Sequence, residues 1–509
     1  MSVKSCLYFI FATMLKRLVY LFIVFCFTSS LQAQNKYLTD KKIEKKGSQL
    51  KDNLNAWSLE KCVQFARENN LQISAQKLNE KLAHLQLIQS KASRFPSVNA
   101  NSNLAETYGR SIDPTSNQFV TKGFLYNTLG VQTNTLLFGW FQKKYQIQQN
   151  QLDLESTQEA YEQLKDDISL NIATAYLRVL MMREQVKISE SQLRLDREQL
   201  NQTEQFVNAG KLPELNLAQM FSQLANDSAL WVNNQTEEQI AMLQLRAIMN
   251  FDFEDDFDIM SPDINMFDIN LLDQYSTPAN IFLVAKNNQH RAKMNQLKLL
   301  SAEKNYAIAK AASYPQLSVF SNLSTNFSTN VFDITGQTYI GETFLGNVVV
   351  AGNSYTLTRP EYTFTTATRP ILKQYGNNIQ ANAGIGISFP ILNGFVNKTN
   401  IERARIGIQS QQLTTETDQQ KLQQDIYTAY QQAKAASKKY DASFKAYEAA
   451  KRALDFASKR YNIGLMNTFE YTSTQNNFFT TSANLLSAKY DYIFKLKIID
   501  YYMGNPIKL

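Results

Sequence analysis

Four stretches of the chain alternate apolar and polar residues with a period of two, which predicts β-strands that have one apolar face. These stretches lie near Val98, Leu129, Leu317 and Ile379. Their polar positions hold amides, hydroxyls and glycines without charges, and their lengths are near the roughly 9–11 residues with which a strand crosses a membrane. Two β-hairpins are therefore expected, over 96–138 and 315–391. Inside the second, the Gly- and Thr-rich stretch 328–378 reads as a long exposed loop.

A period of seven residues follows each hairpin. In the second half every seventh position is hydrophobic, and the position three residues further on is small. The hydrophobic positions are Ile426, Ala433, Tyr440, Tyr447, Leu454 and Tyr461. The first half keeps this register 254 positions earlier, from Ile172 to Val207. Sustained heptads predict long helices that pack closely as a coiled coil. We expect these helices over 141–208 and 396–462.

Glycines mark the ends of both predicted long helices. Gly210 and Gly464 are helix stop signals, and Pro213 and Thr468 begin a new helix shortly afterwards. A turn this short makes the next helix run back beside the first. We therefore expect return helices over 214–250 and 468–503, with tip turns at the two glycines.

The same order of elements occurs twice, as an internal repeat over 57–250 and 278–503. Each half opens with an amphipathic helix, which begins at Ser58 in the first and at Thr277-Pro278 in the second. Each opening helix is expected to run without interruption to an aromatic–proline pair, from which the hairpin starts. The offset between the halves is 219 positions at these pairs and 254 at the tip glycines, so the second hairpin carries an insertion.

An acidic segment without heptads, 251–277, joins the two halves. It reads as a solvated connection, because a calcium loop would need a glycine at its sharp turn and none is present. Residues 504–509 are a short C-terminal tail.

The N-terminus reads as a secretory signal. Lys16 and Arg17 precede an apolar run and small residues, which predicts a signal peptide over 1–33 with cleavage after Ala33. A Lys-rich leader, 34–56, follows it. The remaining chain would keep Cys62 as its one cysteine, which excludes an intrachain disulfide.

Composition argues against nucleic-acid binding and against catalysis. The chain has 52 Lys and Arg residues and 45 Asp and Glu residues, which is not the excess that a nucleic-acid partner would require. Its two histidines, His84 and His290, lie in the opening helices, where surface or helix-contact roles are expected. No zinc-protease motif, phosphate-binding loop or Ser-His-acid set is present. We expect no enzyme activity, no catalytic residues, no cofactor and no metal site.

Short motifs mark matching places in the two halves. The first helix has Trp-Ser-Leu-Glu at 57–60 and Glu-Asn-Asn at 68–70. Each hairpin starts at an aromatic–proline pair and ends in a Leu-x-Gly triplet, at Gly139 and Gly394.

The most specific motif is the second tip turn. It reads Arg-Tyr-Asn-Ile-Gly over 460–464, followed by Glu470 and Tyr471, and its partner in the first half is 206–210. Individually these motifs are weak, but they occur together and in duplicate over 57–503. In this combination the chain resembles the TolC family of outer-membrane efflux and secretion channels.

The resemblance implies a homotrimer in which four transmembrane β-strands per chain complete a 12-stranded barrel. It adds a tunnel of long antiparallel coiled-coil helices, so the expected class is a mixed α and β membrane protein. Strand number supports the trimer independently. Four strands cannot close a barrel, and the interior of about eight is nearly filled by side chains, so three chains are the first to leave a channel.

The resemblance also implies a location and partners. The barrel would lie in the lipid of the bacterial outer membrane, and the tunnel would extend into the periplasm. The partners would be a periplasmic adaptor (membrane-fusion) protein and an inner-membrane pump, with the trimer acting as their passive exit duct. The alternative is a secreted coiled-coil adhesin or structural spacer, which explains the heptads but not the uncharged strand faces.

Two residues near the second tip turn are candidates for a gate. Tyr461 ends the heptad series, and the family uses a tyrosine there in contacts that close the periplasmic aperture. The family also carries an aspartate six residues after the second turn glycine and another nine after it, where this chain has Glu470 and Ser473. A trimer would thus present three carboxylates, which attract cations. Membrane-interface aromatics are expected at the strand ends, namely Phe138, Trp140, Phe141, Phe389 and Phe395.

Overall fold

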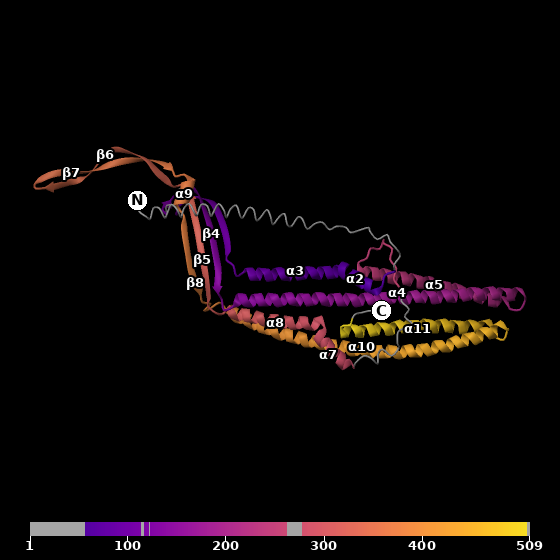
Figure 1. The fold of residues 1–509 in the computed structure, drawn as a ribbon. Helices are drawn as coiled ribbons and strands as arrows, with labels where there is room; N and C mark the ends of the chain where they lie inside the picture. Colours follow the sequence, from indigo (N-terminus) through magenta and orange to yellow (C-terminus); the bar gives the residue numbers. More distant parts are fainter. Residues whose placement is uncertain (1–55, 113–116, 122, 262–276, 506–509) are drawn as a thin grey trace. The chain divides into compact units, whose positions relative to one another are not determined.

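The structure, a computed structural model, describes residues 56–112, 117–121, 123–261 and 277–505 (Figure 1). The expected signal peptide over 1–33 lies outside the described residues. The same holds for the leader up to residue 55, for the second part of the acidic connection and for the end of the C-terminal tail.

Both halves are built from four helices of the same lengths. The opening helix has 11 residues, the next 22, the long helix 67 and the return helix 36. In the first half these are α2 (Leu59–Asn69), α3 (Leu71–Ala92), α4 (Gln142–Asn208) and α5 (Glu214–Met249). In the second they are α7 (Pro278–Asn288), α8 (His290–Ala311), α10 (Val396–Asn462) and α11 (Thr468–Met503).

The opening helix is broken in each half, so the expectation of one uninterrupted helix is wrong. Ser58 caps α2 as expected, through a hydrogen bond from the Lys61 N–H of 3.3 Å. The chain then turns extended at Asn70, whose side chain accepts from the Gln72 and Ile73 N–H groups and donates to the Ile248 carbonyl. An asparagine that bonds to the backbone in this way competes with helix continuation. Amphipathic spacing alone could not reveal the break.

Four strands form one antiparallel sheet that joins the halves. The strands are β1 (Ser97–Thr107), β4 (Phe124–Phe138), β5 (Gln316–Ser328) and β8 (Gln380–Ser388), paired in that order. Residues directly opposite one another share a face of the sheet. One such row across all four strands is apolar: Ala100, Val131, Leu323 and Ala381. The adjacent row, on the other face, consists of amides: Asn99, Gln132, Asn322 and Asn382.

The predicted loop over 328–378 is instead a second long β-hairpin followed by a short helix. Strands β6 (Phe332–Val350) and β7 (Asn353–Thr368) pair antiparallel, and α9 (Ile371–Asn377) leads into β8. Three register shifts fall at glycines spaced five residues apart, Gly336, Gly341 and Gly346. Each bulge interrupts the period of two and glycine is normally a turn signal, so the sequence read as a loop. A minor pair, β2 (Ser111–Ile112) and β3 (Phe119–Val120), lies in the first hairpin.

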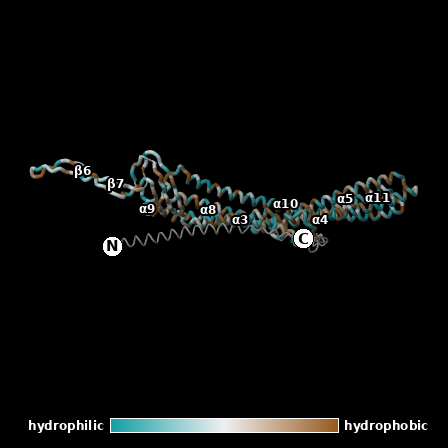
Figure 2. Tube along the Cα trace, turned by 90° about the horizontal axis from the view of Figure 1, so that it is seen from above, coloured by the Kyte–Doolittle hydropathy of each residue, from teal (hydrophilic) through white to brown (hydrophobic). Residues whose placement is uncertain are grey.

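The helical part buries the heptad positions. Helix α4 packs against α3, α5, α8 and α11, while α10 packs against α8 and α11. Hydrophobic and hydrophilic residues are interleaved along these helices rather than segregated into blocks (Figure 2). Ile172, Val179, Ile426 and Ala433 are almost fully buried. No helix among the described residues is long and apolar enough to cross a membrane.

The first part of the acidic connection contacts the helices through its apolar residues, while its acidic side chains stay exposed as expected of a solvated segment. Ile259 is buried and bridges to Trp57, and Asp258 forms an ion pair of 2.5 Å with Arg183. Arg183 also pairs with Glu238 of α5 at 3.0 Å. Residues 251–261 are therefore held against α4 by an arginine that two acids share.

Candidate functional site at the helical tips

Both tip turns adopt the left-handed backbone that glycine allows. Gly210 has φ 70° and Gly464 has φ 76°, and a Cβ atom on either would meet no neighbour within 4 Å. The Leu465 N–H donates to the Arg460 carbonyl at 2.9 Å, and the Lys211 N–H does the same with Phe206. The two turns are thus equivalent helix ends of the kind that favours glycine.

Tyr461 is buried at the second tip. Its ring stacks on that of Tyr471 with centroids 4.7 Å apart, and Ala457 lies in the same cluster. Its hydroxyl is 3.4 Å from the Thr468 hydroxyl. The Asn216 side chain donates to the same hydroxyl at 2.9 Å, so Thr468 joins the first hairpin to the second. The sequence pointed to Tyr461, but nothing in it paired Asn216 with Thr468.

Glu470 lies in the first turn of α11 and is exposed. Asn467 caps this helix by accepting the Glu470 N–H at 2.8 Å. The carboxylate faces solvent within two turns of the buried tyrosine pair. The structure therefore places Tyr461 and Glu470 near the same tip but in different surroundings, one packed and one solvated.

The five predicted interface aromatics lie where strands join helices, and all are exposed. The Trp140 ring lies tilted against that of Tyr314, with centroids 4.8 Å apart, and its indole N–H donates to the Pro315 carbonyl at 2.9 Å. Phe138 contacts the rings of both Trp140 and Phe141. Phe141 and Phe395 precede α4 and α10 with φ of 65° and 62°, so both halves turn into the long helix with the same unusual backbone. Phe389 follows β8 and is also exposed.

The two histidines lie on the second helix of each half. His290 lies 2.6 Å from a Glu159 oxygen and 3.7 Å from an Asp166 oxygen, which is a contact between α8 and α4. His84 is exposed on α3. Within the described residues, no group of three His, Cys, Asp or Glu side chains could hold a metal ion.

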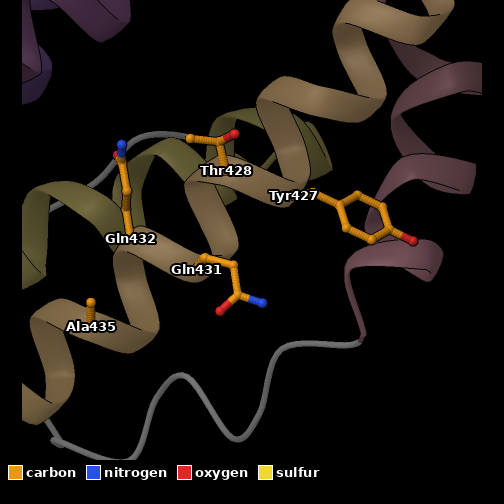
Figure 3. Close-up of a pocket in the computed structure, with 5 residues that line it drawn as sticks. All are labelled: Tyr427, Thr428, Gln431, Gln432 and Ala435. Carbon is orange, nitrogen blue, oxygen red and sulfur yellow. The ribbon is translucent and has the colours of Figure 1, made fainter.

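A shallow hollow of about 440 Å³ lies on α10 (Figure 3). Its lining residues are Tyr427, Thr428, Gln431, Gln432 and Ala435. None of the five carries a carboxylate, imidazole, thiol or amine. The hollow thus offers no acid–base pair or strong nucleophile.

The chain belongs to the outer membrane efflux protein family, whose model matches residues 62–250 and 284–504. The two matched segments correspond to the two structural halves. No curated protein sequence matches the chain. The family is one of channels rather than enzymes, and it places the protein in the outer membrane with a helical tunnel in the periplasm.

Solved structures show the same fold at low sequence identity. The chain is similar to the channel protein CusC, with a TM-score of 0.69 and 16% identity over 88% of this chain and 92% of that one. It is similar to the outer membrane protein VceC of Vibrio cholerae, with a TM-score of 0.66 and 14% identity over 88% and 96%. For the outer membrane channel CmeC of Campylobacter jejuni the TM-score is 0.67, with 15% identity over 90% of each chain. The expected fold class, long antiparallel helices with a β-barrel sheet, is confirmed.

Proposed function

We propose that three copies of this chain form the exit duct of a tripartite efflux or secretion system, which conducts its substrates passively. One observation carries the proposal, namely a sheet with an apolar face and two free edges. Among the described strands, β1 and β8 each pair along one side only. Lipid does not tolerate open strand edges, so in a membrane the sheet must continue into another copy.

Strand number sets the number of copies. Two chains would supply eight strands, and side chains fill the interior of a barrel with about eight strands. Three chains supply 12 and leave a lumen. In this arrangement the apolar row through Val131 faces lipid, and the amide row through Gln132 faces the lumen.

The remaining parts follow from this placement. The exposed aromatics Phe138, Trp140, Phe141, Phe389 and Phe395 would lie at the periplasmic membrane interface, because they sit where each strand joins a helix. The helices would then extend into the periplasm, where their tips would meet an adaptor protein and an inner-membrane pump. Tyr461 would close the aperture by packing, and the exposed Glu470 carboxylates of three copies would favour cations there.

A pair of neighbouring substitutions on β4 tests the barrel. Val131→Arg would place a charge in lipid, at a cost of about 2–4 kcal/mol near the membrane centre. We expect this variant to be lost from detergent-extracted outer membranes. Gln132→Arg would place the same charge in the lumen, so this variant should still assemble, with altered ion selectivity in a planar bilayer.

Three measurements of the native protein complete the test. We expect the mass of three chains in detergent, ion conductance in a bilayer, and recovery from membranes only with detergent. A monomer, or equal tolerance of arginine at both positions, would contradict the barrel. Recovery in the soluble fraction would instead support the secreted spacer or adhesin.

A further inference from the structure

A buried acid cluster lies deeper in the helical bundle than the tip, between three helices. Asp196 of α4 is 1% exposed, Asp227 of α5 is 7% exposed, and Gln475 of α11 is 1% exposed. The Gln475 amide donates to Asp196 Oδ1 at 2.8 Å. The Gln223 amide donates to Asp227 Oδ2 at 2.6 Å. The cluster therefore joins the first helical hairpin, α4–α5, to the return helix of the second.

The two carboxyl groups are neighbours, since Asp227 is the largest influence on the pKa of Asp196 after burial. Two carboxylates can only accept, and Asp196 Oδ2 has no hydrogen-bond donor among the described residues, so a bond between the two acids requires a hydrogen on one of them. Burial, followed by the bond to Asp227 and its charge, raises the pKa of Asp196 to about 8.

The groups around the pair supply no compensating charge. On α11 the neighbour is Tyr471, whose pKa is raised mainly by burial and then by Tyr461, Asp196 and Glu198, while a hydrogen bond with Ser458 lowers it. Tyr461 of α10 stacks on Tyr471. No Lys or Arg is among the groups that shift the pKa of Asp196. A second negative charge here would remain buried and unpaired, which is strongly unfavourable.

We propose that Asp196 and Asp227 share a proton and act as a latch, which holds α11 against α4 and α5 while the proton is bound. This proposal rests on the proposed channel function, because α11 carries Glu470 and Thr468 at the aperture. Gln475 is five residues from Glu470, or about 7–8 Å along a helix. When the proton is lost, the two carboxylates would repel each other, and this repulsion would loosen α11 at the level of the gate.

The direction of the pH dependence follows from the raised pKa of Asp196. The folded protein binds the proton more tightly than the unfolded chain, in which the pKa of an aspartate is about 4. The contact of α11 with α4 and α5 is therefore tightest at low pH and loosens as the pH rises towards about 8. One proton can change the open-to-closed ratio by at most about tenfold per pH unit.

Asp196→Asn tests the latch, because asparagine imitates the protonated acid. Its oxygen still accepts from Gln475, and its NH2 group can donate to Asp227. In planar bilayers the native conductance should rise with pH up to about 8, whereas Asp196→Asn should stay low throughout. Asp455→Asn, which removes an exposed acid of α10 paired with Lys459, is the matched control and should keep the native profile.

Thermal unfolding in detergent provides a readout that does not need a conducting channel. The native melting temperature should fall relative to that of Asp196→Asn as the pH rises, and the two should converge at low pH. Parallel profiles of native protein and Asp196→Asn would overturn the latch. Loss of the pH-dependent rise in conductance in Glu470→Gln would also overturn the latch, since the aperture carboxylates would then be the groups that sense pH. Absence of conductance in every variant, with the melting difference intact, would contradict the channel function but not the latch.

Discussion

The helical hairpins α4–α5 and α10–α11 have the same lengths but different chemistry along their buried seams. Four consecutive heptad positions of α10 are small, and their counterparts in α4 lie 254 positions earlier. In α10 they are Ala436, Ser443, Ala450 and Ala457, and in α4 they are Met182, Ser189, Asp196 and Thr203. The first seam is polar towards its tip, and the second is nearly all alanine.

The polar seam makes its hydrogen bonds in two ways. The Thr203 hydroxyl donates to the Gln199 carbonyl of its own helix at 2.8 Å, and Ser189 bonds likewise to Val186. Asp196 instead depends on partners from two other helices. A buried polar group that needs a particular partner fixes the register of packed helices, whereas alanine fits any neighbour of the right depth. We infer that the first hairpin is the anchored one and that the second can shift more freely.

The largest effect is expected from placing the acid in the wrong seam. Ala450→Asp puts a carboxyl at the α10 position equivalent to Asp196, where the native residue is 5% exposed. Without partners like Gln475 and Asp227, the buried charge should cost roughly 3–5 kcal/mol of unfolding free energy. Chemical denaturation in detergent at neutral pH measures the loss, and much of it should return at low pH as the carboxyl is protonated. A loss of unfolding free energy below about 1 kcal/mol would mean that water reaches the α10 position, so that this seam is not buried like the first.

The second effect is on the aromatic stack at the tip of the alanine seam. Tyr461→Ala removes a buried ring that stacks on Tyr471, and it should cost about 3 kcal/mol or more. The trimer should persist with raised basal conductance, because the helices below the tip keep their packing. Tyr461→Phe is the control, since it keeps the stack and loses only the contact with Thr468. A fall in melting temperature without any rise in conductance would reduce Tyr461 to a packing residue.

The sequence revealed the elements that repeat a simple period and missed those that interrupt it. The heptads from Ile426 to Tyr461 predicted the long helices, and the alternation around Val131 predicted the sheet. The bulged hairpin β6–β7 was missed because its glycines break the strand period every five residues. The helix breaks were missed because each is made by a single extended residue, Asn70 or Gln289, inside a continuous helical pattern.

The site was predictable in part, for a similar physical reason. Gly464 and Tyr461 carry local signals, namely a backbone that glycine allows and the last heptad position. The Asn216–Thr468 bond and the Asp196 cluster depend on residues 252 and 279 positions apart in the chain. Only the packed helices bring such pairs together, so no local pattern encodes them.

A smaller effect is expected at the two tip glycines, and here the hairpins should behave alike. Gly210→Ala and Gly464→Ala each force a side chain into the left-handed region, which costs about 1–2 kcal/mol, although open space surrounds both positions. Denaturation of the two single variants should give similar losses, and the double variant should give their sum. A much larger loss at Gly464 would show that the second turn has contacts in the assembled trimer that the first turn lacks.

The smallest effect on stability is expected at Glu470, where the two hairpins differ in the position of an exposed acid rather than in packing. Each return helix has an acid in its first turn, Glu214 in α5 and Glu470 in α11. Because both acids interact favourably with the positive end of their helix, Glu→Gln should cost only about 0.3–1 kcal/mol at either position.

The electrostatic roles of Glu214 and Glu470 should differ, since Glu470 alone is proposed to ring the aperture. In a planar bilayer with a salt gradient, Glu470→Gln should lower the cation preference given by the reversal potential, while Glu214→Gln should leave it unchanged. The difference should shrink at high salt, because screening acts over about 10 Å at 0.1 M and less above it. If both variants kept the native selectivity at low salt, Glu470 would be a helix-start residue like Glu214, and the two tips would be electrostatically equivalent.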